Sequence, residues 1–205
     1  MADIMKTTRI PSQLSRHERA VGLPPAGDWL VETSRSSISF SGRASRIAPT
    51  VRAQFGEVRG GLHLAADPNG SRVGVCVDVR TITTGNALWD DMLRAADTFR
   101  AREYPLAHYA STAVRWTDAG FDVEGLLEIA GTKTALTLKA AVAANADTTV
   151  TLNAQGSIDP RSAGVELNVP GARLLMPRAM ALCIAVTATR TRPSARSARR
   201  FALAS

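Results

Sequence analysis

The feature that most constrains the fold of this chain is an alternation of apolar and polar residues with a period of two. Between residues 148 and 158, Val150, Leu152 and Ala154 alternate with threonine, asparagine and glutamine. Successive side chains of a β-strand point to opposite faces, so this pattern predicts a half-buried antiparallel strand. Because the pattern recurs in residues 72–80, 121–129, 136–142 and 182–186, we expect a chain that is mostly β-sheet.

Short turn signals separate these segments. Combinations of Asp, Asn, Gly, Pro and Ser occur in residues 67–70, 118–120, 145–147 and 159–162, and they predict hairpin connections. The alternation also changes phase between Val51 and Leu64, from odd-numbered to even-numbered apolar residues. This change predicts a bulge or a tight bend near Gly56.

Residues 86–99 break the pattern. There Leu88, Met92, Ala95 and Phe99 recur at helical spacing, and Asn86 precedes them as a typical N-cap. Many short strands with one helix describe a sandwich or an up-and-down barrel, and the residues alone do not separate the two. We favour an all-β, antiparallel barrel with one short helix, because closure removes exposed strand edges.

The net charge of +7 is concentrated at the two ends of the chain. Residues 189–205 hold five arginines and no acid, and residues 1–26 contribute a further +2, which leaves the part between them neutral. A neutral core is unlike a surface that neutralises several phosphates, so nucleic acid is not an expected partner of the barrel. The basic tail is either a solvated end or a weak peripheral contact for a membrane or another anionic partner.

The ends also set the expected domain boundaries. The turn-forming run from Gly22 to Gly27 separates a flexible N-terminal extension (residues 1–26) from the barrel domain (residues 27–190), and a basic flexible tail (residues 191–205) follows. The first 26 residues contain no apolar core of a signal peptide, and no stretch is long enough to cross a bilayer. We therefore expect a cytoplasmic protein in which Cys76 and Cys183 stay reduced.

Several short motifs of residues 27–190 resemble, in their order and spacing, those of the YceI-like proteins. The central motifs are Thr81-Ile82-Thr83-Thr84-Gly85-Asn86, Asp90, Leu93, Arg94, Asp97, Phe99, Tyr104-Pro105, Tyr109 and Ser111-Thr112. Before them lie Trp29, Ser36, Ile38, Phe40, Phe55-Gly56 and Gly60, and after them Gly125, Leu127, Ile129 and Gly131. The resemblance implies a lipocalin-like antiparallel barrel with a long apolar cavity for polyisoprenoid chains.

The chain departs from the polar pattern of that family. Where members commonly place histidines and other polar groups, this chain has Arg35, Ala44, Met92 and Ala130. Trp89 stands where an arginine is usual, and Thr98 stands where an aromatic residue is usual. Pro160 and Ala163 interrupt the arginine and aromatic positions near the end of the family's pattern. The resemblance therefore implies an apolar interior, while these departures leave the head-group end without an assigned site.

The inward-facing stripes supply the candidate ligand-binding residues. From the residues alone such stripes favour a solid core over a cavity, whereas the resemblance favours a cavity. The candidates are Phe40, Phe55, Val75, Val77, Met92, Phe99, Tyr109, Phe121, Ile129, Leu136, Leu138, Val150, Leu152 and Ile184. Of these, Met92, Phe99 and Tyr109 are expected either to shape the mouth of the cavity or to pack the helix on the sheet.

Polar residues of the helix and of the strands do not form a catalytic or metal site. We expect Asn86 to cap the helix and Asp90 and Arg94 to form an i,i+4 ion pair. No clustered metal ligands, no G-x-S-x-G elbow and no phosphate-binding loop occur, so we expect no catalytic residue and no metal. A barrel enzyme would need a buried acid or base, and the acids of the strands fall on polar faces, namely Asp78, Asp122 and Glu124.

Two functions fit these observations. The first is a non-catalytic binding or carrier protein that holds a hydrophobic chain (a polyisoprenoid, a quinone-like lipid or a fatty acid) and needs no other cofactor. The second is a barrel scaffold whose arginine-rich tail binds a protein or a membrane surface. A homodimer is compatible with both.

Overall fold

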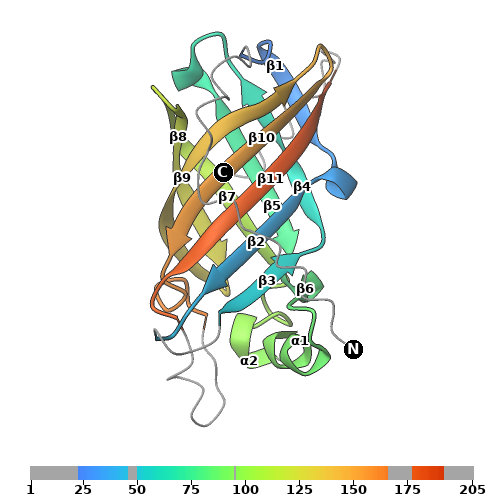
Figure 1. The fold of residues 1–205 in the computed structure, drawn as a ribbon, viewed down its shortest axis with the longest axis vertical. Coiled ribbons are helices and arrows are strands. Elements are labelled where there is room, and N and C mark those ends of the chain that lie inside the picture. Colours follow the sequence, from blue (N-terminus) through green and yellow to red (C-terminus); the bar gives the residue numbers. More distant parts are fainter. Residues whose placement is uncertain (1–22, 46–49, 95, 166–176, 192–205) are drawn as a thin grey trace, which may run out of the picture.

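The computed structural model describes residues 23–45, 50–94, 96–165 and 177–191, and within them eleven strands form one antiparallel sheet. The sheet closes on itself, because β1 pairs with β4 on one side and with β11 on the other (Figure 1). The strands are β1 (Gly27–Val31), β2 (Ser37–Gly42), β3 (Val51–Phe55), β4 (Val58–Leu64), β5 (Arg72–Asp78), β6 (Ile82–Thr83), β7 (Leu106–Thr117), β8 (Gly120–Ile129), β9 (Thr132–Asn145), β10 (Thr149–Ile158) and β11 (Met180–Arg190). The expected all-β antiparallel barrel is confirmed.

Six of these strands are the halves of three bent strands. β1 and β2 together form one bent strand along β11. β4 and β3 form the next bent strand, in which β4 pairs with β1 and β3 pairs with β2. β5 and β6 pair with β4 and β3 in the same way. Counted with β7 to β11, the described barrel therefore has eight strands in up-and-down order.

The change of phase near Gly56 is the bend between β3 and β4. Ala53 and Phe55 are buried before it, and Val58 and Leu62 are buried after it. The two residues between the strands absorb the extra step, and the backbone N–H of Gly56 donates to Thr81 Oγ1 at 3.2 Å. The predicted bend is thus confirmed at its expected position.

Helices α1 (Ala87–Arg94) and α2 (Ala96–Phe99) cover one end of the barrel, on either side of residue 95 (Figure 1). Asn86 caps α1, since its side-chain oxygen accepts the backbone N–H groups of Leu88 and Trp89 at 3.0 and 3.3 Å. The predicted helical segment and its N-cap are therefore confirmed. We call this end of the barrel the helical end.

A polar network holds α1 against β6. The carboxylate of Asp90 is buried and accepts the hydroxyl of Thr83 and both the N–H and the hydroxyl of Thr84, at 2.5–2.8 Å. Arg94 donates to the carbonyl of Ile82 at 2.9 Å and lies 3.7 Å from Asp90, which is the expected i,i+4 pair. These hydrogen bonds hold the pKa of Asp90 below its usual range, despite the opposing effect of burial.

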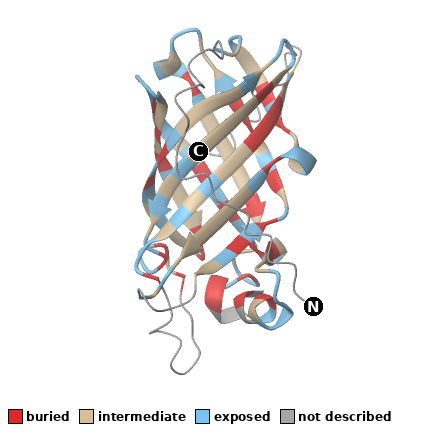
Figure 2. Ribbon diagram, in the orientation of Figure 1, coloured by how far each residue is buried: buried red, intermediate tan, exposed pale blue. Residues whose placement is uncertain are grey.

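Buried apolar side chains form three layers along the barrel, and buried positions occur at both of its ends and on the helices (Figure 2). The first layer, at the helical end, includes Ile82, Leu93 and Phe99. Partly buried side chains link it to the middle layer, which is Tyr109, Val114, Val123, Leu136 and Leu138. Val73 links the middle layer to the third, which we call the Trp29 layer and which contains Trp29, Leu62, Val150 and Ala188.

The expected terminal segments fall mainly on residues 1–22 and 192–205, which lie outside the described residues. The positions Met92, Ala96 and Asp97 are described as part of the helices but not in their side chains. No helix in the described ranges is long and apolar enough to span a membrane.

A candidate ligand-binding cavity

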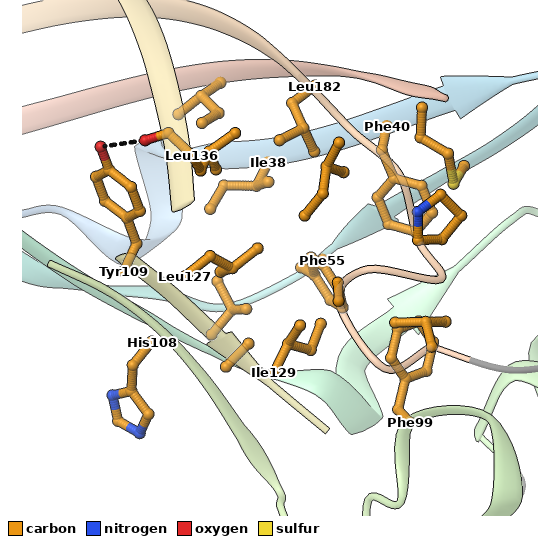
Figure 3. A pocket seen from close by; sticks show the side chains of 18 of the residues that line it. Ile38, Phe40, Phe55, Phe99, His108, Tyr109, Leu127, Ile129, Leu136 and Leu182 are labelled. Carbon is orange, nitrogen blue, oxygen red and sulfur yellow. Dashed lines mark hydrogen bonds between the residues drawn. The ribbon is translucent and has the colours of Figure 1, made fainter. Parts of the chain in front are cut away.

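A cavity of about 170 Å³ lies between the helical end and the middle layer of the barrel (Figure 3). Its walls come from β2, β3, β5, β7, β8, β9, β10 and β11, because each contributes the inward-facing half of its alternating side chains. Loop residues and both helices complete it at the helical end. We call that end the mouth and the opposite end, at the middle layer, the floor.

Ten of the fourteen candidate residues line this cavity. They come from strands that are distant in sequence, and the closure of the barrel turns their apolar faces toward one another. They are Phe40, Phe55, Val75, Val77, Phe99, Tyr109, Ile129, Leu136, Leu138 and Ile184. That these side chains touch a ligand stays a prediction.

Three of the remaining candidates lie away from the cavity. Phe121 packs against the middle layer on the side away from the mouth, with its ring 4.8 Å from that of Trp116. Val150 belongs to the Trp29 layer and Leu152 packs against it. Their side chains share the inward face with the lining residues but lie at a different depth in the barrel. The side chain of the fourth, Met92, lies outside the described part of the chain.

Tyr109 lies at the floor, at the end of the cavity opposite the mouth, and the mouth is one of the two places considered for it. Figure 3 shows its ring at the end of the cavity opposite Phe99. Its hydroxyl donates toward the carbonyls of Val123 and Leu136, at 2.9 and 3.3 Å, and burial raises its pKa to about 12. The ring lies over Gly125, where a Cβ atom would come within 2.6 Å of the tyrosine Cζ. Tyr109 is therefore a fixed, neutral part of the floor.

Aromatic side chains form the wall nearest the mouth. The rings of Phe40 and Phe55 have centroids 5.6 Å apart, and Phe99 of α2 stands edge-on to Phe55 at 6.4 Å. Phe99 thus contacts the barrel wall and lines the cavity at once, which combines the two roles considered for it.

The sequence missed most of the lining at the mouth. Four missed residues are those at which the chain departs from the polar and aromatic pattern of the resembling family: Trp89, Thr98, Pro160 and Ala163. Leu93, Val165 and Pro177 also line this part of the cavity. Pro160, Ala163, Val165 and Pro177 lie in turns and loops, where no periodicity could have identified them, whereas Trp89 and Leu93 lie one turn apart on α1. By contrast, Ile38, Leu127, Ile158 and Leu182 continue the inward stripes of their strands, and the alternation could have identified them.

The cavity contains almost no polar surface. None of the described residues that line it carries a carboxylate, an ammonium or a guanidinium group. His108 belongs to the lining through its position on β7, but its ring points away from the cavity (Figure 3). The described lining therefore offers apolar contact and no charged anchor.

Three acids of the strands, Asp78, Asp122 and Glu124, lie outside the described lining of the cavity. Asp78 forms an ion pair with Arg80 at 2.5 Å, and the hydrogen bond from Arg80 lowers its pKa. Asp122 lies 3.7 Å from Lys139 and Glu124 lies 3.3 Å from Arg115. All three acids are absent from the cavity lining, as their polar faces predict.

An eight-stranded up-and-down barrel around an apolar cavity is a lipocalin-like barrel. The particular family follows from the sequence match, since the model of the YceI-like domain matches residues 29–188. The chain belongs to this family. The recognised resemblance is confirmed, and no curated protein sequence matches the chain.

Solved structures of low sequence identity share the fold. BcnA of Burkholderia cenocepacia is 19% identical with a TM-score of 0.68, over 77% of this chain and 98% of that one. A polyisoprenoid-binding domain from Saccharophagus degradans, implicated in plant cell wall breakdown, is 13% identical with a TM-score of 0.62, over 82% and 100% of the two chains. A YceI protein of Campylobacter jejuni is 18% identical with a TM-score of 0.62, over 72% and 89%.

Proposed function

We propose that the barrel is a non-catalytic carrier that holds the hydrophobic chain of a polyisoprenoid, a quinone-like lipid or a fatty acid in this cavity. The observation that carries the proposal is a cavity whose described lining is apolar and free of charged groups. An unoccupied apolar cavity forfeits packing contacts along its walls, which a bound chain would restore.

Apolar contact is sufficient to bind such a ligand. Each methylene group that moves from water into the cavity contributes about 0.8 kcal/mol. A head group would stay at the mouth or outside the barrel, because a charged or strongly polar group loses its hydration in an apolar site. The lining thus favours ligands with a neutral hydrocarbon portion.

A structural relative supports the ligand class. The domain from Saccharophagus degradans is described as polyisoprenoid-binding and has the same fold. At 13% identity the two proteins share only the fold, so the argument for a hydrophobic ligand rests on the apolar lining of this chain.

The polar groups of the cavity favour binding over chemistry. A general acid or base should titrate near the working pH, whereas the phenol of Tyr109 has a pKa of about 12 and is hydrogen-bonded to backbone carbonyls. The described lining holds no carboxylate, ammonium or guanidinium group that could activate a nucleophile.

Native mass spectrometry of the purified full chain, followed by organic extraction, tests the proposal. We expect a bound lipid that is lost in Leu182→Trp, because residue 182 lines the cavity and the larger side chain fills it. The matched control is Cys183→Trp, the same new side chain at the exposed neighbouring position on β11. Circular dichroism and thermal unfolding check that both variants fold. Equal lipid content in the two folded variants would refute the proposal.

A further inference from the structure

We infer that the cavity takes only the end of a hydrophobic chain, because Tyr109, Leu136 and Leu138 close it with a floor partway along the barrel. This inference rests on the proposed function and specifies its ligand: the terminal segment of an isoprenoid or alkyl chain enters, and the remainder stays at the mouth.

The floor is held in place by the strands beneath it. The hydroxyl of Tyr109 bonds to two carbonyls, so the ring cannot turn aside without leaving a buried polar group unpaired. The side chain of Leu138 lies over Gly156, where a Cβ atom would come within 2.7 Å of Leu138 Cδ2. The glycines at positions 125 and 156 therefore leave the room that the two floor side chains occupy.

The barrel beyond the floor is packed. Val114 and Val123 lie in the middle layer but do not line the cavity. The Trp29 layer follows, in which Trp29 is 1% exposed and Val150 and Ala188 are fully buried. A chain that reached this depth would have to displace side chains that already pack against one another, which costs free energy.

The size of the cavity agrees with this limit. At about 170 Å³ it is close to an engineered protein cavity of ~150 Å³ that binds benzene. Such a volume accommodates roughly one or two isoprene units. Any further units of a long chain would gain no contact with the walls.

The test is isothermal titration calorimetry of the delipidated full chain with isopentenol, geraniol, farnesol and geranylgeraniol. While added carbons still enter the cavity, affinity should tighten about fourfold per methylene. We expect the gain to stop near geraniol, so that farnesol and geranylgeraniol bind within a few-fold of it. A continued rise in affinity through geranylgeraniol would overturn the inference and leave the proposed function intact. Failure of every alcohol to bind would instead overturn the proposed function.

A pair of matched variants locates the limit. Leu138→Ala removes part of the floor, so farnesol should bind at least about tenfold more tightly than geraniol. Leu152→Ala makes the same change beside the Trp29 layer, outside the cavity. In this variant the affinity should still stop rising near geraniol. If Leu138→Ala does not fold, the smaller change Leu138→Val keeps the comparison. An identical series in folded variants at positions 138 and 152 would contradict the assignment of the floor.

Discussion

At the scale of single residues, Tyr109 determines the shape of the cavity. It is 6% exposed, it donates to backbone carbonyls of two neighbouring strands, and Gly125 leaves room for its ring. Its position could not be read from the sequence, because alternation shows that residue 109 faces inward but not how far it lies from either end of the barrel.

The raised pKa of Tyr109 makes its contribution to stability depend on pH. Its pKa is about 12 in the folded chain and about 10 when unfolded, so its contribution is complete below pH 10 and is lost as the pH rises toward 12. Tyr109→Phe should lower the free energy of unfolding at neutral pH by about 1–2 kcal/mol. Between pH 10 and 12 this difference should shrink by up to about 2 kcal/mol, as the wild type alone loses stability. Urea unfolding of the wild type and of Tyr109→Phe at several pH values measures this difference. A difference that stays constant with pH would contradict a raised pKa of Tyr109 in the folded chain.

A second residue-scale prediction concerns Gly125. A Cβ atom at this position would come within 2.6 Å of Tyr109 Cζ and 2.5 Å of the Ala110 carbonyl oxygen. Gly125→Ala should therefore push the tyrosine ring from its site and reduce stability by about 1–3 kcal/mol. Gly74→Ala is the control, since a Cβ atom there meets no atom within 4 Å. Equal urea midpoints for the two variants would show that the contact with Tyr109 does not matter.

At the scale of elements, the helical end depends on the attachment of α1 to β6. The buried carboxylate of Asp90 receives three hydrogen bonds from Thr83 and Thr84. Since α1 carries Trp89 and Leu93 into the lining, this attachment also holds the wall of the mouth in place.

Loss of the Asp90 charge should loosen this end selectively. Because the pKa of Asp90 is lowered, its stabilisation is present above the unfolded pKa, near pH 4, and is lost as the pH falls through the folded value. Asp90→Asn should accelerate hydrogen exchange in α1 and β6 at neutral pH and remove this acid dependence. Asp91→Asn is the matched control, because the Asp91 side chain is 79% exposed. Similar exchange in both variants would count against the proposed anchor.

The same elements show what the sequence could and could not predict. Alternation identifies the strands, the bend at Gly56 and the inward faces, because a strand places every second side chain on one face. Alternation does not give the depth of a residue along the barrel, so it groups Val150 and Leu152 with Leu138, although they lie beyond the floor that Leu138 helps to form. Loop residues such as Pro160 and Pro177 reach the cavity only through tertiary structure.

At the scale of the whole molecule, the two ends of the barrel have different physical properties. The Trp29 end is packed, and Trp29 itself is 1% exposed and donates to the carbonyl of Pro25 at 3.3 Å. The helical end is hollow and carries the candidate site. Stability and ligand binding should therefore respond to different substitutions.

Trp29→Ala tests this separation. Loss of a buried tryptophan should lower the free energy of unfolding by about 3–5 kcal/mol. Because residue 29 does not line the cavity, geraniol affinity should change less than twofold at a temperature where the variant is folded. Denaturant unfolding and calorimetry measure the two quantities, and a loss of affinity at full folding would show that the ends are coupled.

The most direct test of the central claim is a crystal structure of the chain with a fatty alcohol that carries bromine on its terminal carbon. The anomalous signal of bromine locates the chain end without assumptions about the rest of the ligand. We expect the bromine inside the barrel, against Tyr109, Leu136 and Leu138, with the hydroxyl toward the helical end. A bromine on the outer surface would contradict binding in the cavity.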